Sequence, residues 1–217
     1  MPLLRRWEKD GGLWGIWHVT ETEDGLMALL ADKSLFAGRL AGIKVPKRRL
    51  EILGVCVLLK DLLGEEKRIL HEDSGKPFLE GDPRRITISH TKGYVAVGVH
   101  GEAVPGMDIE QVGEKVRRVA SRFIRADEMP GREQMTGEES LFQLLLHWSA
   151  KETLYKLLGC LDVDFRTHLR IRPFKLSPEG EFVGEEFCSA AGTSCLIHYF
   201  VHPDFVCTYC VRSADRR

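Results

Sequence analysis

Two long helical segments, each ended by a glycine, constrain the fold of this chain more than any other feature. Residues 46–63 form the clearer one, because Pro46 suits the first turn of a helix and Gly64 suits its end. Residues 141–158 form the other, and Gly159 stops it in the same way. Stretches that favour β-strands accompany both helices, which indicates two halves that each mix helices and strands.

The predicted class is therefore α+β, with halves of similar size at residues 1–103 and 104–217. Residues 26–36 indicate helical turns, and residues 116–124 keep the apolar spacing of one amphipathic helix. Residues 128–139 are rich in Pro, Gly and Glu and are expected to be a flexible connection. Predicted strands occupy residues 13–19, 85–89, 93–100, 107–110, 169–172, 195–201 and 205–211.

The charge balance excludes some classes of protein. Lysine and arginine number 31 against 32 aspartate and glutamate, and no basic tail is present, which argues against a dedicated nucleic-acid or membrane-surface protein. No apolar run reaches the length of a membrane span, and charges come too early for a signal peptide. We expect a cytoplasmic monomer, and local basic clusters leave room for a small anionic ligand.

Cys207 and Cys210 have the C-x-x-C spacing that occurs in zinc sites and redox motifs. No second ligand pair follows at zinc spacing, and the residues around them favour a β-strand. The strand interpretation is the better supported of the two.

Asp108 and Glu110 are the first candidate site residues. Side chains of a strand alternate between its faces, so these two carboxylates share one face while Met107 and Ile109 occupy the other. Neighbouring carboxylates repel each other, and a divalent cation such as Mg²⁺ relieves that repulsion. The alternative is a half-buried strand with a solvated polar face.

Glu152 is the second candidate, because it continues the apolar line of the helix one turn after Trp148. A carboxylate on the buried side of a helix is costly unless it is paired or bound to a metal. The alternative is a surface ion pair between Glu152 and Lys156, which have the i, i+4 spacing.

Two further segments could hold a phosphate. Ser89 and His90 are expected to end a strand just before a turn at residues 91–92, where hydroxyl, imidazole and amide groups can bind oxygen atoms. Gly75, Lys76 and Pro77 form a turn with a point charge. Either segment alone could be an ordinary turn.

Taken in order, the four segments resemble the motifs of the 4′-phosphopantetheinyl transferases of the Sfp type. The corresponding residues are Gly75-Lys76-Pro77, Ser89-His90-Thr91, Gly106-Met107-Asp108-Ile109-Glu110, and residues 148–156 from Trp148 to Lys156. The last two motifs are the specific ones, and the resemblance covers residues 75–156.

This resemblance implies two similar α+β halves related by a pseudo-twofold, with coenzyme A in the cleft between them. It also implies Mg²⁺-dependent transfer of 4′-phosphopantetheine from coenzyme A to a serine of an apo acyl or peptidyl carrier protein, with release of 3′,5′-ADP. Asp108, Glu110 and Glu152 would be the metal ligands. Glu152 or a water would take the serine proton, and Lys156 would hold a pyrophosphate oxygen.

The resemblance also implies a nucleotide site. Lys76 and Pro77 would flank the nucleotide, and Ser89 and His90 would contact its phosphates. Arg48 or Arg49 would bind the 3′-phosphate, with Lys44 or Lys47 able to share that role. Two rival interpretations remain: a non-catalytic homologue that binds coenzyme A or a carrier, and an unrelated Mg²⁺-dependent phosphohydrolase or nuclease.

Overall fold

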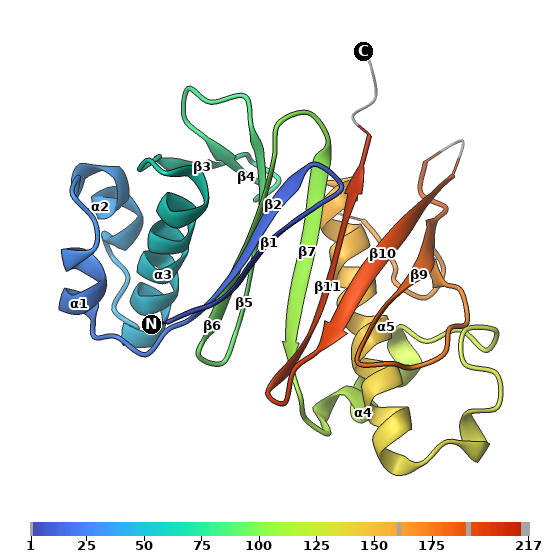
Figure 1. Cartoon of the computed structure of the whole chain (residues 1–217). Coiled ribbons are helices and arrows are strands. Elements are labelled where there is room, and N and C mark those ends of the chain that lie inside the picture. The colour runs from blue at the N-terminus through green and yellow to red at the C-terminus, as the bar shows by residue number, and fades with distance from the viewer. Residues whose placement is uncertain (1, 160–161, 190–191, 214–217) are drawn as a thin grey trace. The chain divides into compact units, whose positions relative to one another are not determined.

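The computed structural model describes residues 2–159, 162–189 and 192–213. The chain divides into two compact units; the first ends at Pro105 and the second runs from Gly106 to Arg212. Each unit combines its own antiparallel sheet with helices (Figure 1), which confirms the predicted α+β class. Among the described residues, no helix has both the length and the apolar character needed to cross a bilayer.

The first unit contains a six-stranded sheet in the order β1-β2-β6-β5-β4-β3. Three helices, α1, α2 and α3, lie on one side of it (Figure 1). The strands are β1 (Leu3–Lys9), β2 (Gly12–His18), β3 (Ile69–His71), β4 (Pro77–Leu79), β5 (Arg85–Thr91) and β6 (Tyr94–His100), and the helices are α1 (Glu23–Ala28), α2 (Ser34–Leu40) and α3 (Pro46–Leu63).

Helix α3 forms the centre of this unit's core. It begins at Pro46 and ends at Gly64, whose φ of 75° is a left-handed conformation that glycine adopts without strain. Its apolar side packs on β2 and β6, where the Cβ of any residue replacing Gly15 would approach Leu58 to 2.7 Å. A larger residue at position 15 would therefore require the Leu58 side chain to shift.

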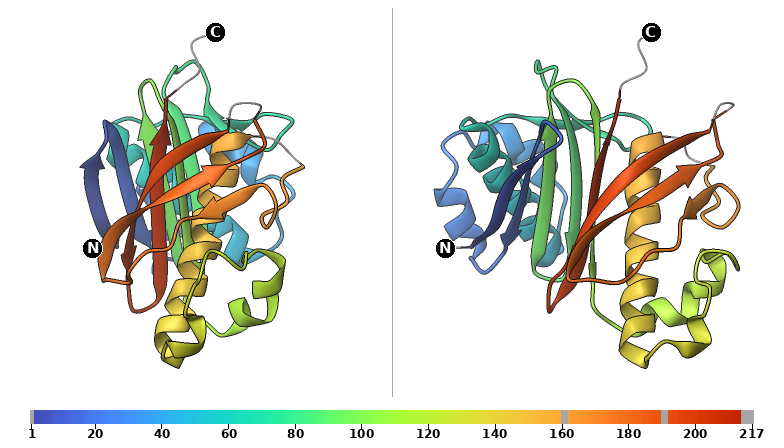
Figure 2. Two further views of the ribbon diagram at one scale, coloured as in Figure 1. Left: turned by 90° about the vertical axis from the view of Figure 1, so that its right-hand side faces the viewer. Right: turned by 45° about the vertical axis from the view of Figure 1, so that its right-hand side comes forward.

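The second unit contains a five-stranded sheet in the order β7-β11-β10-β9-β8. The long helix α5 lies along one face of this sheet (Figure 2). A capping box starts α5, because Thr136 and Glu139 each accept the other's backbone N–H. The elements are β7 (Val104–Gln111), α4 (Lys115–Val119), α5 (Gly137–Leu158), β8 (Leu169–Ile171), β9 (Glu179–Glu186), β10 (Thr193–Val201) and β11 (Phe205–Arg212), with 3₁₀ turns at Ala120–Arg122 and Arg132–Gln134.

Some predicted elements have different bounds in the structure, and some observed strands were not predicted. The expected single helix at 116–124 is α4 followed by a 3₁₀ turn, and the expected flexible stretch at 128–139 contains the start of α5. Strand β5 continues through Thr91, so the turn that follows is at residues 92–93, where Gly93 has a φ of 78°. Strands β1, β3, β4 and β9 were not predicted; β1 and β3 lie at sheet edges and β3 and β4 are only three residues long, so their apolar patterns are weak.

Candidate functional site

A cluster of charged side chains lies between β7 and α5 in the second unit. Trp148, Glu152 and Lys156 follow one another at intervals of four residues and so lie along one line of the helix. The Lys156 ammonium donates to Asp108 Oδ1 at 2.8 Å, and the Trp148 indole N–H donates to Glu110 Oε1 at 2.9 Å. Both strand carboxylates therefore face α5, and Glu152 lies between the two helix residues that contact them.

Gly106 explains how β7 and α5 come this close. The Cβ of any larger residue at this position would lie 2.8 Å from the Thr153 carbonyl oxygen and 2.8 Å from Leu157 Cγ. Because the Thr153 oxygen is main chain, the helix would have to move away from the strand. The glycine before Asp108 is thus a requirement of the packing that brings the carboxylates to α5.

The cluster carries more negative than positive charge. Burial, followed by the charge of Asp108, raises the pKa of Glu110 to about 7, although the bond from Trp148 opposes this change. Burial and Asp108 likewise raise the pKa of Glu152 to about 7, while Lys156 lowers it. One ammonium therefore faces three carboxylates, and two of them release their protons only near neutral pH.

The donor set fits a hard divalent cation such as Mg²⁺, which prefers carboxylate oxygens and would relieve this repulsion. In their present positions, no three His, Cys, Asp or Glu side chains of the described chain form a group able to hold a metal ion. The Lys156 ammonium lies against Asp108 instead. Coordination by Asp108, Glu110 and Glu152 accordingly stays a prediction that rests on their chemistry and their proximity.

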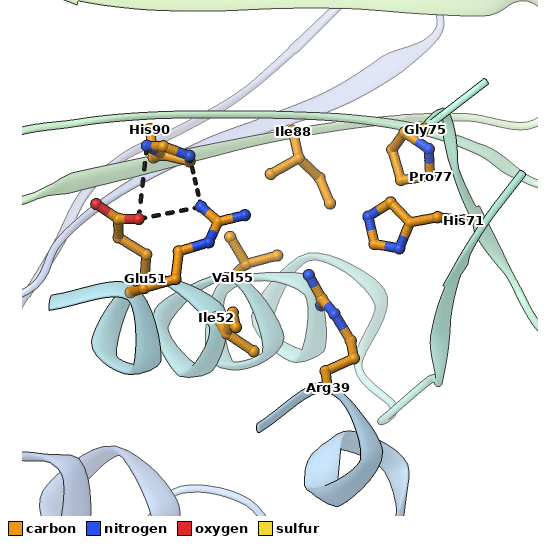
Figure 3. A pocket seen from close by; sticks show the side chains of 10 residues that line it. Arg39, Glu51, Ile52, Val55, His71, Gly75, Pro77, Ile88 and His90 are labelled. Carbon is orange, nitrogen blue, oxygen red and sulfur yellow. Dashed lines mark hydrogen bonds and ion pairs between the residues drawn. The ribbon is translucent and has the colours of Figure 1, made fainter. Parts of the chain in front are cut away.

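A second candidate site is a pocket of about 160 Å³ in the first unit, between α3, the β3–β4 hairpin and β5 (Figure 3). Arg48 and His90 lie together in it, with Arg48 Nη1 2.6 Å from His90 Nε2 and 3.1 Å from Glu51 Oε2. Gly75 and Pro77 contribute the opposite wall. Two of the four sequence motifs thus meet in one pocket with the start of α3.

Basic side chains outnumber acidic ones in the pocket lining, which contains Arg39, Arg48, His71 and His90 and the carboxylate of Glu51. Arg39 points into it from α2, and no described residue accepts a hydrogen bond from its buried Nη1 atom. Burial lowers the pKa of the Arg39 guanidinium. Burial also lowers the pKa of His71, and the neighbouring charges of Arg39 and Arg48 add to this effect. These groups together favour an anion with several oxygen atoms.

Arg48 and Arg49, the two arginines considered for the 3′-phosphate, point to different places in the structure. Arg49 points away from the pocket, donates to both oxygens of Glu23, and also donates to the carbonyls of Leu40 and Ile43. It therefore ties α3 to the preceding helices. Arg48 is the arginine that lines the pocket.

Some of the other predicted nucleotide residues lie outside the pocket lining. Ser89 is buried and faces the opposite side of β5 from His90, as neighbouring strand residues do. Lys76 does not line the pocket, although Gly75 and Pro77 on either side of it do. Lys47 forms an i, i+4 ion pair with Glu51.

Arg39, His71 and Glu51 were missed by the sequence analysis. Arg39 lies in a short helix and His71 in a three-residue strand, and neither belongs to a motif. Only the packing of α2 and β3 beside α3 brings them to the pocket. Elsewhere, Cys207 and Cys210 are both buried in β11, as the strand interpretation predicted.

A family model described as the 4′-phosphopantetheinyl transferase superfamily matches residues 105–210. The matched segment contains the strand–helix cluster and excludes the basic pocket. No curated protein matches the chain. The match implies a transferase of phosphopantetheine.

Proposed function

The domain at residues 105–210 belongs to the 4′-phosphopantetheinyl transferase superfamily, and on that premise we propose that the chain transfers 4′-phosphopantetheine from coenzyme A to a serine of an apo carrier protein. The observation that carries the proposal is the meeting of Asp108, Glu110, Glu152 and Lys156 between β7 and α5. We also propose that the chain divides functionally into halves at residues 1–103 and 104–217 and that it is of the Sfp type.

Asp108, Glu110 and Glu152 would hold Mg²⁺, which supplies positive charge for the pyrophosphate of coenzyme A. The serine hydroxyl oxygen forms a bond to the phosphorus that carries pantetheine, and the bond from that phosphorus to 3′,5′-ADP breaks. Glu152 would take the hydroxyl proton, because it is the carboxylate that α5 places beside Asp108 and Glu110. Lys156 would move from Asp108 to a phosphate oxygen when the substrate binds.

The basic pocket of the first unit would take the 3′-phosphate of coenzyme A. Arg48 and Arg39 offer donors to a phosphate, and the buried Nη1 atom of Arg39 would gain an acceptor; His90 Nε2, which accepts from Arg48 in the structure, would have to give up that bond to donate. Pro77 would flank the nucleotide at the pocket wall.

The proposed function is tested by incubating the protein with coenzyme A, Mg²⁺ and a panel of apo carriers from fatty-acid, polyketide and peptide synthesis. Mass spectrometry should show one carrier gaining the phosphopantetheine mass while 3′,5′-ADP appears in equal amount. Binding of coenzyme A without release of 3′,5′-ADP for any carrier would favour the non-catalytic homologue. Release of phosphate from plain nucleotides without a carrier would favour a phosphohydrolase.

Dephospho-coenzyme A is expected to bind the wild type at least about tenfold more weakly than coenzyme A. A charge-assisted hydrogen bond is worth about 1.5–3 kcal/mol, and the 3′-phosphate would make several in the pocket. Arg39→Met and Arg48→Met should each weaken coenzyme A and bring the two ligands closer in affinity. Isothermal titration calorimetry without carrier measures both ligands.

Arg85→Met is the matched control, because Arg85 is an exposed arginine of β5 outside the pocket lining. It should leave both affinities unchanged. Equal affinity of the wild type for the two ligands would place the 3′-phosphate elsewhere.

A further inference from the structure

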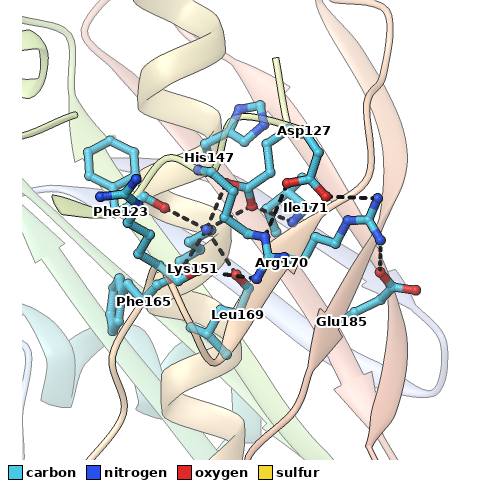
Figure 4. Close-up of polar contacts among 12 residues, drawn as sticks. Phe123, Asp127, His147, Lys151, Phe165, Leu169, Arg170, Ile171 and Glu185 are labelled. Atoms are coloured by element: carbon cyan, nitrogen blue, oxygen red, sulfur yellow. Dashed lines mark hydrogen bonds and ion pairs between the residues drawn. The ribbon is translucent and has the colours of Figure 1, made fainter. Parts of the chain in front are cut away.

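Lys151 is a lysine with no exposed side-chain surface, one residue before Glu152 on α5. Its ammonium donates to three main-chain carbonyl oxygens: that of Phe123 at 2.6 Å, that of Phe165 at 2.9 Å and that of Leu169 at 3.0 Å. Figure 4 shows these bonds converging on one atom. Two separate stretches of the chain, one at Phe123 and one at residues 165–169, are thus held to α5 at a single point.

The charge of Lys151 is balanced by Glu128, which is equally buried. The ammonium lies 2.7 Å from Glu128 Oε1, and the carboxylate also accepts the backbone N–H groups of Arg125 and Ile171. A buried ion pair adds little to stability compared with apolar residues of the same volume. The pair is therefore better explained by the segments that it holds in place than by a gain in stability.

The path from Lys151 to that cluster is continuous. The rings of Phe123 and Phe165, whose carbonyls Lys151 holds, lie against Trp148 with centroid separations of 5.1 and 5.5 Å. Trp148 in turn donates its indole N–H to Glu110. Two rings therefore set the direction of the Trp148 indole, and the Lys151 ammonium binds the main-chain carbonyls of the same two residues.

We propose that Lys151 is a positioning residue for the carboxylate cluster: by holding the carbonyls of Phe123 and Phe165, it orients Trp148 to bind Glu110. The inference rests on the proposed function only in that Glu110 is one of the proposed Mg²⁺ ligands. Among the described residues, no hydrogen bond joins Lys151 to a carboxylate of the cluster. Lys151 therefore acts through Trp148.

The direct test is hydrogen exchange of the Trp148 indole N–H, followed by NMR in metal-free buffer without coenzyme A or carrier. Trp148→Phe identifies the resonance by its loss. Lys151→Met combined with Glu128→Gln removes the ammonium and its bonds to the carbonyls without leaving an unpaired buried carboxylate. Phe165→Leu removes one supporting ring and keeps the carbonyl that Lys151 holds.

Both the double variant and Phe165→Leu should speed exchange of the Trp148 indole at least about tenfold, which corresponds to losing one hydrogen bond. The Trp14 indole, which donates to the Lys9 carbonyl in the first unit, serves as an internal control and should not change. Phe205→Leu, a buried change on β11, controls for general loss of stability in the same unit.

Unchanged Trp148 exchange in the double variant or in Phe165→Leu would overturn the proposal, as would an equal increase in Phe205→Leu. A second measurement, Mg²⁺ binding by calorimetry, should show affinity at least about tenfold weaker in the double variant than in Phe205→Leu. Equal Mg²⁺ affinity in those two variants would also overturn it. A wild type that binds no Mg²⁺ would count against the proposed metal site alone, because the exchange experiment decides the role of Lys151 without metal.

Discussion

Glu152→Gln is expected to lower kcat for carrier modification by about 10²–10⁴-fold, the range for loss of a general base. The change keeps the shape of the side chain and one carbonyl oxygen, but it removes the basicity and the negative charge. Affinity for coenzyme A should stay nearly unchanged, because Arg39, Arg48 and His90 of the basic pocket remain. Steady-state kinetics and calorimetry on the same preparation measure the two quantities.

The alternative role for Glu152, a helix ion pair with Lys156, predicts almost unchanged turnover and a stability loss of a few tenths of a kcal/mol. The structure weakens that alternative, since the Lys156 ammonium is bonded to Asp108 and to the Met107 carbonyl. A Glu152→Gln enzyme with near-normal kcat would leave Glu152 without a role in proton transfer.

The same variant should also change how stability depends on pH in metal-free buffer. The pKa of Glu152 is about 7 in the folded protein against its usual 4.5, so between these values the folded protein holds a proton that the unfolded chain has released. The wild type therefore loses stability as pH rises through this window, by at most about 3 kcal/mol. Glu152→Gln cannot titrate, so its melting temperature should exceed that of the wild type at pH 8 and approach it near pH 4.5.

Asp108→Ala is expected to abolish transfer at any Mg²⁺ concentration. Asp108 is 4% exposed, raises the pKa of both glutamates and binds Lys156, so its loss removes the centre of the cluster. Because an uncovered Lys156 could disturb the packing, Asp108→Asn should be made in parallel; it keeps an oxygen that Lys156 can donate to. Mg²⁺ titrations of activity, with circular dichroism to check folding, measure the effect.

Asp162→Ala provides the matched control, since Asp162 is an exposed aspartate of the second unit. It should behave as the wild type. Near-normal turnover of a folded Asp108→Ala protein at saturating Mg²⁺ would show that the proposed metal ligands are wrong.

The sequence by itself determined the features that depend on neighbouring residues. Helix α3 begins at Pro46 and ends at Gly64 as predicted, because a proline at the first turn and a glycine beyond the last act through local backbone geometry. Asp108 and Glu110 point the same way because strand side chains alternate. The order of short motifs was also sufficient to find the superfamily that matches residues 105–210.

The tertiary structure alone decided which distant residues meet. Arg48 lines the pocket while Arg49 binds Glu23. The packing of α1 on α3 determines this difference, and the sequence of two adjacent arginines does not indicate it. Lys151 sits in a motif with Glu152, yet its ammonium is buried on carbonyls from segments 14 to 28 residues away. Edge strands β1 and β3 likewise take their form from partners elsewhere in the sheet. Contacts between segments remote in the chain leave no local pattern, because their energy comes from packing and desolvation in the folded state.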